Sequence, residues 1–196
     1  MDKHVNQTVS HCYKILKDIG RISSGLEKSR LERLVHAVIS SRIDNCNSLF
    51  INLNKEILYK LQKVQNAAAR MVLGKRKRDS ASHALKKLHW LNVDARVTFK
   101  VLLLVYKIIN GLNPQNLGIR YKGFNGRPDD YLLLDTPNFK TAYGKRIFAY
   151  HGSRLWNALP ANIRAEDNIE VFKKSLKTIL FDGNEELKRK AFKYRQ

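Results

Sequence analysis

Residues 57–79 join an amphipathic helical pattern to an abrupt run of cations. Apolar side chains recur every three or four residues from Ile57 to Met71, which predicts a helix with one packed face. Gly74 supplies the left-handed residue that commonly ends such a helix. The polar side chains at the same spacing on the opposite face are Lys63, Asn66 and Arg70. The consecutive cations after the glycine are Lys75, Arg76, Lys77 and Arg78.

A packed face backed by a basic face and a basic loop suits a phosphate backbone better than a small-molecule pocket. The alternative interpretation is a solvated helix followed by a localisation-like basic run, and charge pattern alone fits both. A second cationic stripe is predicted on the first helix, opposite the apolar residues Val5 to Ile19. Its members are Lys14, Lys17 and Arg21.

The charge balance favours a polyanionic partner. The chain of 196 residues carries 37 Lys and Arg against 17 Asp and Glu, a net charge of +20. The excess is +9 over residues 1–79 and +11 over residues 80–196, so both halves attract polyanions. No apolar run is long enough to cross a bilayer, and the N-terminus lacks a signal-peptide pattern. We therefore expect an intracellular protein, nuclear or cytoplasmic, with no membrane partner.

The predicted fold is mainly α. Residues 1–79 are expected to form a three-helix, thumb-like bundle ending in the basic loop, with Asn54 capping the third helix. The second helix is expected over residues 27–43, and its predicted buried residues are Leu31, Leu34, Val35, Val38 and Ile39. Residues 80–182 are expected to form a mostly helical domain with a Gly/Pro-rich insert at 111–152, and residues 183–196 a charged tail. Short strands are predicted at 131–134 and 146–150, one helical turn at 154–160, and a last helix over 167–181 with a capping box at Asp167 and Glu170.

Catalytic and metal-binding patterns are sparse. Asp129 and Asp130 are the only two adjacent aspartates, and we interpret them as a turn cap rather than a polymerase metal site. The six histidines and two cysteines show no zinc-ligand spacing, and two cysteines make no disulfide framework. We therefore predict no catalytic residues, no metal, no cofactor and no small-molecule substrate.

Four blocks of sequence carry a family resemblance. They are SSRIDNCNSLF (40–50), LQKVQNAAARMV (61–72), KKLHWLNVDARVTFKVLLLVYKIINGLNP (86–114) and YGKRIFAYHGSRLWNALPANIR (143–164). Together and in this order they resemble the C-terminal portion of reverse transcriptases encoded by LINE (non-LTR) retrotransposons of the jockey-like group. Asn45 stands where that family usually has tyrosine.

The resemblance implies that residues 1–79 are the helical thumb, which grips a template–primer duplex, and that residues 80–196 are the C-terminal domain. It implies contacts to RNA or DNA phosphates from the cations named above. The palm aspartates and the endonuclease of the parent polyprotein are missing, so Mg²⁺ chemistry belongs only to the full-length parent. The chain would then be a non-catalytic, truncated fragment of an RNA-directed DNA polymerase. The alternatives are a basic helical module that binds acidic proteins, or a degenerate element remnant with no function.

Overall fold

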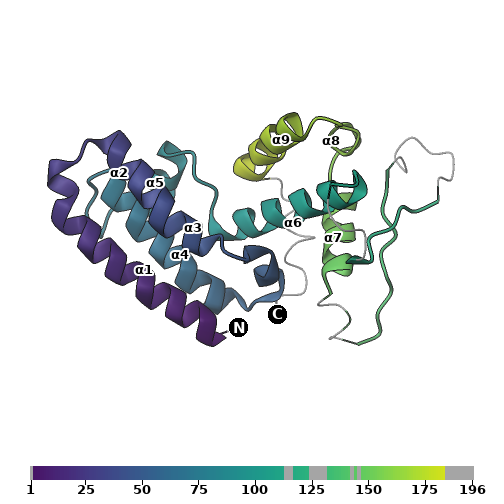
Figure 1. Cartoon of the computed structure of the whole chain (residues 1–196), viewed down its shortest axis with the longest axis horizontal. Coiled ribbons are helices and arrows are strands. Elements are labelled where there is room, and N and C mark those ends of the chain that lie inside the picture. The colour runs from purple at the N-terminus through teal and green to yellow at the C-terminus, as the bar shows by residue number, and fades with distance from the viewer. Residues whose placement is uncertain (1, 113–116, 124–131, 142–143, 145–146, 184–196) are drawn as a thin grey trace. The chain divides into compact units, whose positions relative to one another are not determined.

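The computed structural model describes residues 2–112, 117–123, 132–141, 144 and 147–183, and its described part is mainly α-helical (Figure 1). Two compact units divide the chain, unit 1 at Met1–Arg96 and unit 2 at Val97–Gln196. The mainly α fold predicted from the sequence is confirmed. Within the described residues, no helix combines the length and the apolar character that a bilayer crossing requires.

Unit 1 is built on three helical runs. They are α1 (Asp2–Ile22); α2 (Lys28–Val35) continued by a π-helical turn (His36–Ser40) and α3 (Ser41–Ile43); and α4 (Lys55–Val72). A short 3-10 turn (Ser23–Gly25) follows α1, and another (Asn47–Asn52) precedes α4. Asn54 caps α4 by accepting a hydrogen bond from the Glu56 amide at 3.1 Å, as predicted. The core takes Val5, Cys12, Leu16 and Ile19 from α1, and Leu61, Val64 and Ala68 from α4.

Helices α1 and α4 lie side by side and run parallel (Figure 1). Near their N-terminal ends, Lys60 Nζ donates a hydrogen bond to Asn6 Oδ1 at 2.9 Å. Near their C-terminal ends, a Cβ added at Gly20 would lie 3.7 Å from the Met71 methyl. The C-terminal ends of α1 and α4 therefore lie at the same end of the bundle.

The second helical run differs from the predicted one in its interior. A regular α-helix was expected from residue 27 to residue 43, but the segment His36–Ser40 is wound as a π-helix. Leu31, Val35 and Ile39 are buried as expected. Leu34 and Val38 are only half-buried, because the buried face is narrower than the apolar pattern suggested.

Residues 80–96 pack as part of unit 1, so the boundary expected after Asp79 falls inside this unit. Helix α5 (Ala81–Lys87) is capped by Ser80 and packs against α4. The Trp90 indole is buried and donates from Nε1 to Glu32 Oε1 at 3.2 Å. Arg96 closes the unit through a bidentate ion pair with Asp44, in which Nε lies 2.8 Å from Oδ1.

Unit 2 is centred on α6 (Val93–Ile109), whose residues from Val97 onward belong to this unit. The Tyr106 ring stacks on the Phe172 ring of α9 (Ile169–Asp182), with 4.3 Å between their centroids. The Trp156 ring lies on the same aromatic cluster, 5.9 Å from the Phe172 centroid. Helix α8 (Ala161–Arg164) connects to this core. Asn168 caps α9 through bonds to the amides of Glu170 and Val171, so the predicted Asp167–Glu170 capping box is wrong.

The strand predicted at 146–150 is also wrong where the structure describes it. Phe148–Tyr150 form the first turn of α7 (Phe148–Asn157), which extends well beyond the single turn expected around Trp156. Gly152 explains why a helix fits here: an added Cβ would lie 2.8 Å from Val105 Cγ2, so the missing side chain lets α7 approach α6 closely. Ala149 and Tyr150 are buried in this first turn, whereas Ile147 just before it is exposed.

Extended structure in the described part of unit 2 is limited to one antiparallel bridge, between Tyr121 and Leu134. Asn157 replaces a neighbouring strand by bonding both the amide and the carbonyl of Leu134, each at 2.8 Å. The predicted strand at 131–134 is therefore reduced to a single bridged residue, with Tyr131 outside the described residues.

Candidate nucleic-acid interface

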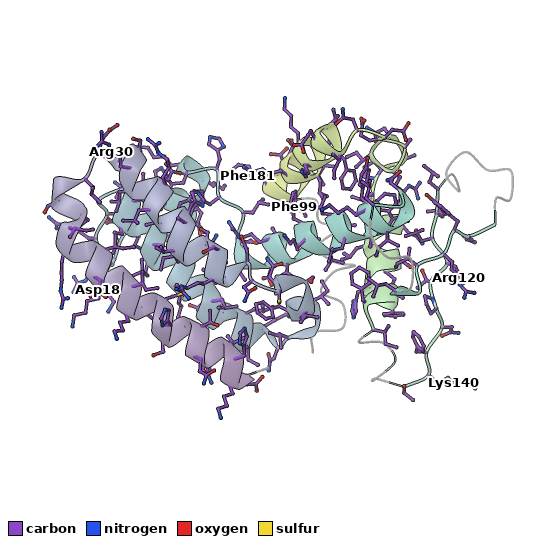
Figure 2. The ribbon with its side chains drawn as sticks, in the orientation of Figure 1. Asp18, Arg30, Phe99, Arg120, Lys140 and Phe181 are labelled. Carbon is purple, nitrogen blue, oxygen red and sulfur yellow. The ribbon has the colours of Figure 1, made fainter. Side chains whose placement is uncertain are left out.

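The three cations predicted on α1 lie on its solvent face. Lys14, Lys17 and Arg21 are all exposed, opposite the buried residues of this helix. Arg21 forms an ion pair with Asp18 at 3.0 Å, and Asp18 projects from the solvent side of α1 (Figure 2). Both partners are more than half exposed, so this pair contributes little to stability and leaves Arg21 available to another anion.

The three polar residues predicted on α4 have different surroundings. Lys63 is exposed, with its ammonium 4.7 Å from the centre of the Tyr59 ring. Asn66 is half-buried and accepts a hydrogen bond from Gln62 Nε2 at 2.8 Å. Arg70 is half-buried, and its Nε donates to the Asp79 carbonyl at 2.8 Å. Lys63 is thus directed to solvent, whereas Asn66 and Arg70 already have partners within unit 1.

The Asn66 contact belongs to an amide network that fixes residues 91–93 against α4. Gln65 is buried and donates from Nε2 to the Leu91 carbonyl at 2.8 Å. Gln62 Oε1 accepts from the Val93 amide at 2.8 Å, and its Nε2 also lies 3.1 Å from Gln65 Oε1. The amide-bearing face predicted for nucleic-acid contact therefore serves partly to hold the end of unit 1 in place.

Residues 75–78, which we call the basic turn, have a backbone held at both ends. Gly74 takes the left-handed conformation predicted for it (φ +61°), and the Lys75 amide bonds the Arg70 carbonyl at 2.8 Å. At the other end, the Asp79 carboxylate accepts from the Arg76 amide at 2.7 Å. The Asp79 amide donates to the Arg76 carbonyl at 3.0 Å, while Arg70 holds the Asp79 carbonyl.

The side chains of the basic turn are free to bind. All four are exposed, and within the described part of the chain none of them forms an ion pair. Asp79, the one acid beside them in sequence, is engaged by the Arg76 amide. This role of Asp79 was not predicted, although its position directly after the cations was a usable signal, because aspartate commonly caps turns.

The parallel packing of α1 and α4 brings two predicted groups of cations to one end of unit 1. Arg21 lies in the last turn of α1, and the basic turn follows the last residue of α4. Lys17 lies one helical turn before Arg21 on the same solvent face, and Lys14 one turn further back. Lys63 lies about three helical turns from the basic turn, on the outward face of α4.

Most of the carboxylates of unit 1 form ion pairs or hydrogen bonds within the unit. The unit carries 19 Lys and Arg against 8 Asp and Glu, a net charge of +11. Asp18 and Glu27 pair with arginines of their own helical turns, Asp44 pairs with Arg96, and Glu32 holds Trp90. The unpaired positive charge is therefore what the surface offers to a partner. Helix α5 adds exposed lysines that sequence reasoning did not select, Lys86 and Lys87.

Further findings concern metal-binding groups and similarity to known proteins. Among the described residues, no group of three or more His, Cys, Asp and Glu side chains is placed to hold a metal ion. The predicted turn at Asp129–Asp130 lies outside the described residues. Comparisons of the chain with protein-family models, with curated proteins and with solved structures give no match.

Proposed function

We propose that unit 1 binds the phosphate backbone of RNA or DNA through the basic turn, together with Arg21, Lys17, Lys14 and Lys63. The observation that carries the proposal is the basic turn itself, which presents four exposed cations on a backbone held by Gly74, Arg70 and Asp79. A prearranged cationic surface loses less conformational entropy on binding than a flexible tail of the same charge.

The proposed binding is independent of base sequence. Lysine and arginine contacts to phosphates fix the position of a strand but carry no base identity. The resemblance to LINE reverse transcriptases supports a template–primer duplex or the element's own RNA as the partner, with unit 1 acting as the thumb. We propose that the chain is a non-catalytic part of such a polymerase, whose palm and endonuclease would supply the chemistry.

The proposal is tested by measuring affinity for a short RNA–DNA duplex by fluorescence anisotropy at several salt concentrations. Five phosphate contacts predict a slope of log K against log salt of about −4 to −5. If all four side chains of the basic turn contact phosphates, replacing them by Gln should reduce the magnitude of that slope by about 3.6, since each lost phosphate contact removes about 0.9. A slope near zero for the native protein would overturn the proposal.

A matched pair of variants separates the basic turn from general charge. K75Q/K77Q and K3Q/K55Q each remove two exposed lysines from unit 1, but Lys3 and Lys55 lie near the N-terminal ends of α1 and α4. The first variant should weaken duplex binding strongly and the second only slightly, with unchanged helical circular dichroism in both. Equal losses would show that binding follows net charge and would refute a site at the basic turn. A primer-extension assay with Mg²⁺ should show no synthesis.

A further inference from the structure

A polar groove lies on unit 1 between α1 and the π-helical turn. Its volume is about 560 Å³, and it is lined mainly by side chains of α1, of the π-helical turn and of α3. The lining residues are His4, Gln7, Thr8, His11, Ala37, Val38, Ser41, Arg42 and Asn45. None of the groups predicted to bind nucleic acid lines this groove.

The groove is rich in hydrogen-bond donors and contains no carboxylate. Arg42 contributes a guanidinium, Gln7 and Asn45 contribute amides, and two imidazoles come from α1. No ion pair engages Arg42 within the described part of the chain. Its positive charge lies close enough to α1 to act on the Cys12 thiol, whose pKa is raised by burial and lowered in smaller part by Arg42. An unpaired guanidinium surrounded by donors selects an anion.

The backbone beside the groove is unusual. The segment His36–Ser40 is π-helical, and Ala37 and Val38 of this segment form the apolar part of the lining. Single π-helical turns inside α-helices are rare and frequently occur at functional sites. Ser41, which also lines the groove, donates its hydroxyl to the Ala37 carbonyl at 2.5 Å. The groove therefore combines an apolar wall with a cationic and amide-bearing wall.

We propose that this groove binds one nucleotide unit, with its phosphate on Arg42 and its base against Ala37 and Val38. The volume accommodates a base, a sugar and a phosphate, and the Gln7 and Asn45 amides are suited to the polar edges of a base. The unit comes either from a free mononucleotide or from a single strand passing over unit 1. The inference does not depend on the basic turn.

The test is a titration of the native protein with AMP, followed by the side-chain signals of His4 and His11 in ¹H–¹⁵N spectra. AMP should shift both signals in a saturable way, and adenosine, which lacks the phosphate, should not. Arg42→Gln should weaken AMP binding at least about tenfold, because the guanidinium is the strongest phosphate ligand of the groove. Gln7→Trp, an exposed substitution that fills the groove without changing charge, should also abolish the shifts.

Arg33→Gln is the matched control, since Arg33 is an exposed arginine of the same helical run that does not line the groove. It should bind AMP as the native protein does. An eight-nucleotide single strand that shifts the same signals at tenfold lower concentration than AMP identifies a strand as the source, and a weaker strand identifies the free nucleotide. Equal binding of AMP and adenosine, or native affinity in Arg42→Gln, would overturn the inference.

These results are separable from those for the basic turn. Arg42→Gln should leave the salt dependence of duplex binding almost unchanged, and the four Gln substitutions in the basic turn should leave AMP binding in the groove unchanged. Loss of both activities in either variant would contradict an independent groove site.

Discussion

Asp79→Ala is expected to weaken nucleic-acid binding although it makes the protein more positive. Asp79 is the acid that organises the basic turn, through its carboxylate bond to the Arg76 amide at 2.7 Å. Removing it raises the net charge from +20 to +21. A model based on charge alone therefore predicts tighter binding, whereas a model based on a prearranged turn predicts weaker binding. The sign of the change decides between them.

The two opposing contributions differ in size. One added charge about 10 Å from a phosphate stabilises the complex by at most about 0.4 kcal/mol in water, and salt reduces this further. A hydrogen bond from a backbone amide to a carboxylate contributes about 1 kcal/mol at an exposed position. Its loss lowers the population of the held conformation, and apparent affinity falls with that population. We expect duplex binding to weaken about threefold to fivefold.

The control is Asp18→Ala, which adds the same charge without touching the basic turn. Asp18 pairs with Arg21 at 3.0 Å, so its removal frees a cation and should strengthen duplex binding slightly. Asp79→Asn keeps an oxygen acceptor for the Arg76 amide and should fall between the native protein and Asp79→Ala. Anisotropy titrations at one fixed salt concentration measure all three. If Asp79→Ala bound as tightly as Asp18→Ala, the held turn would have no role in binding.

Three further predictions concern the packing of the units. Gly152→Ala should lower the free energy of unfolding of unit 2 by about 1–3 kcal/mol, because its Cβ would lie 2.8 Å from Val105 Cγ2. The control Gly123→Ala places its Cβ more than 4 Å from atoms beyond its chain neighbours and should leave denaturant unfolding nearly unchanged. Cys46 is exposed, whereas Cys12 is buried and its thiol pKa is raised. A thiol reagent at about pH 8 should therefore label Cys46 quickly and Cys12 only on unfolding, and fast labelling of both would contradict the burial of Cys12. Burial, with the nearby Asp167 and Glu166, raises the pKa of Tyr106, so unit 2 should lose stability as pH rises above about 10, where the unfolded chain releases the tyrosine proton first. Tyr106→Phe should flatten this alkaline decline in unfolding experiments, and an equally steep decline would exclude Tyr106 as its source.

Local signals in the sequence predicted local structure well. Asn54 caps a helix and Gly74 takes a left-handed conformation, because each of these roles depends on one residue and its immediate neighbours. The failures lie where packing decides. Phe148–Tyr150 have strand-like composition, yet Gly152 allows a helix to approach Val105, a contact that no local pattern reveals.

The candidate site was predictable in part for the same reason. The exposed cations of α1 and the basic turn followed from helical spacing, but the partners of Asn66 and Arg70 did not, since they come from side-chain contacts and from a carbonyl nine residues away. The groove around Arg42 was not predicted, because its lining comes from helices more than 20 residues apart and from a π-helical turn without a sequence signature.

The direction of α4 relative to α1 determines whether the predicted cations can act together. Helix α1 has 21 residues and is therefore about 30 Å long. The contacts of Lys60 with Asn6 and of Met71 with Gly20 show that α4 runs parallel to α1. The basic turn therefore lies at the same end of the bundle as Arg21. With α4 reversed, the turn would lie beside Lys3, about 30 Å from Arg21, a distance of about nine phosphates along one strand. The chain reverses twice between α1 and α4, so these two connections, and not the cations themselves, place the cationic groups at one end of unit 1.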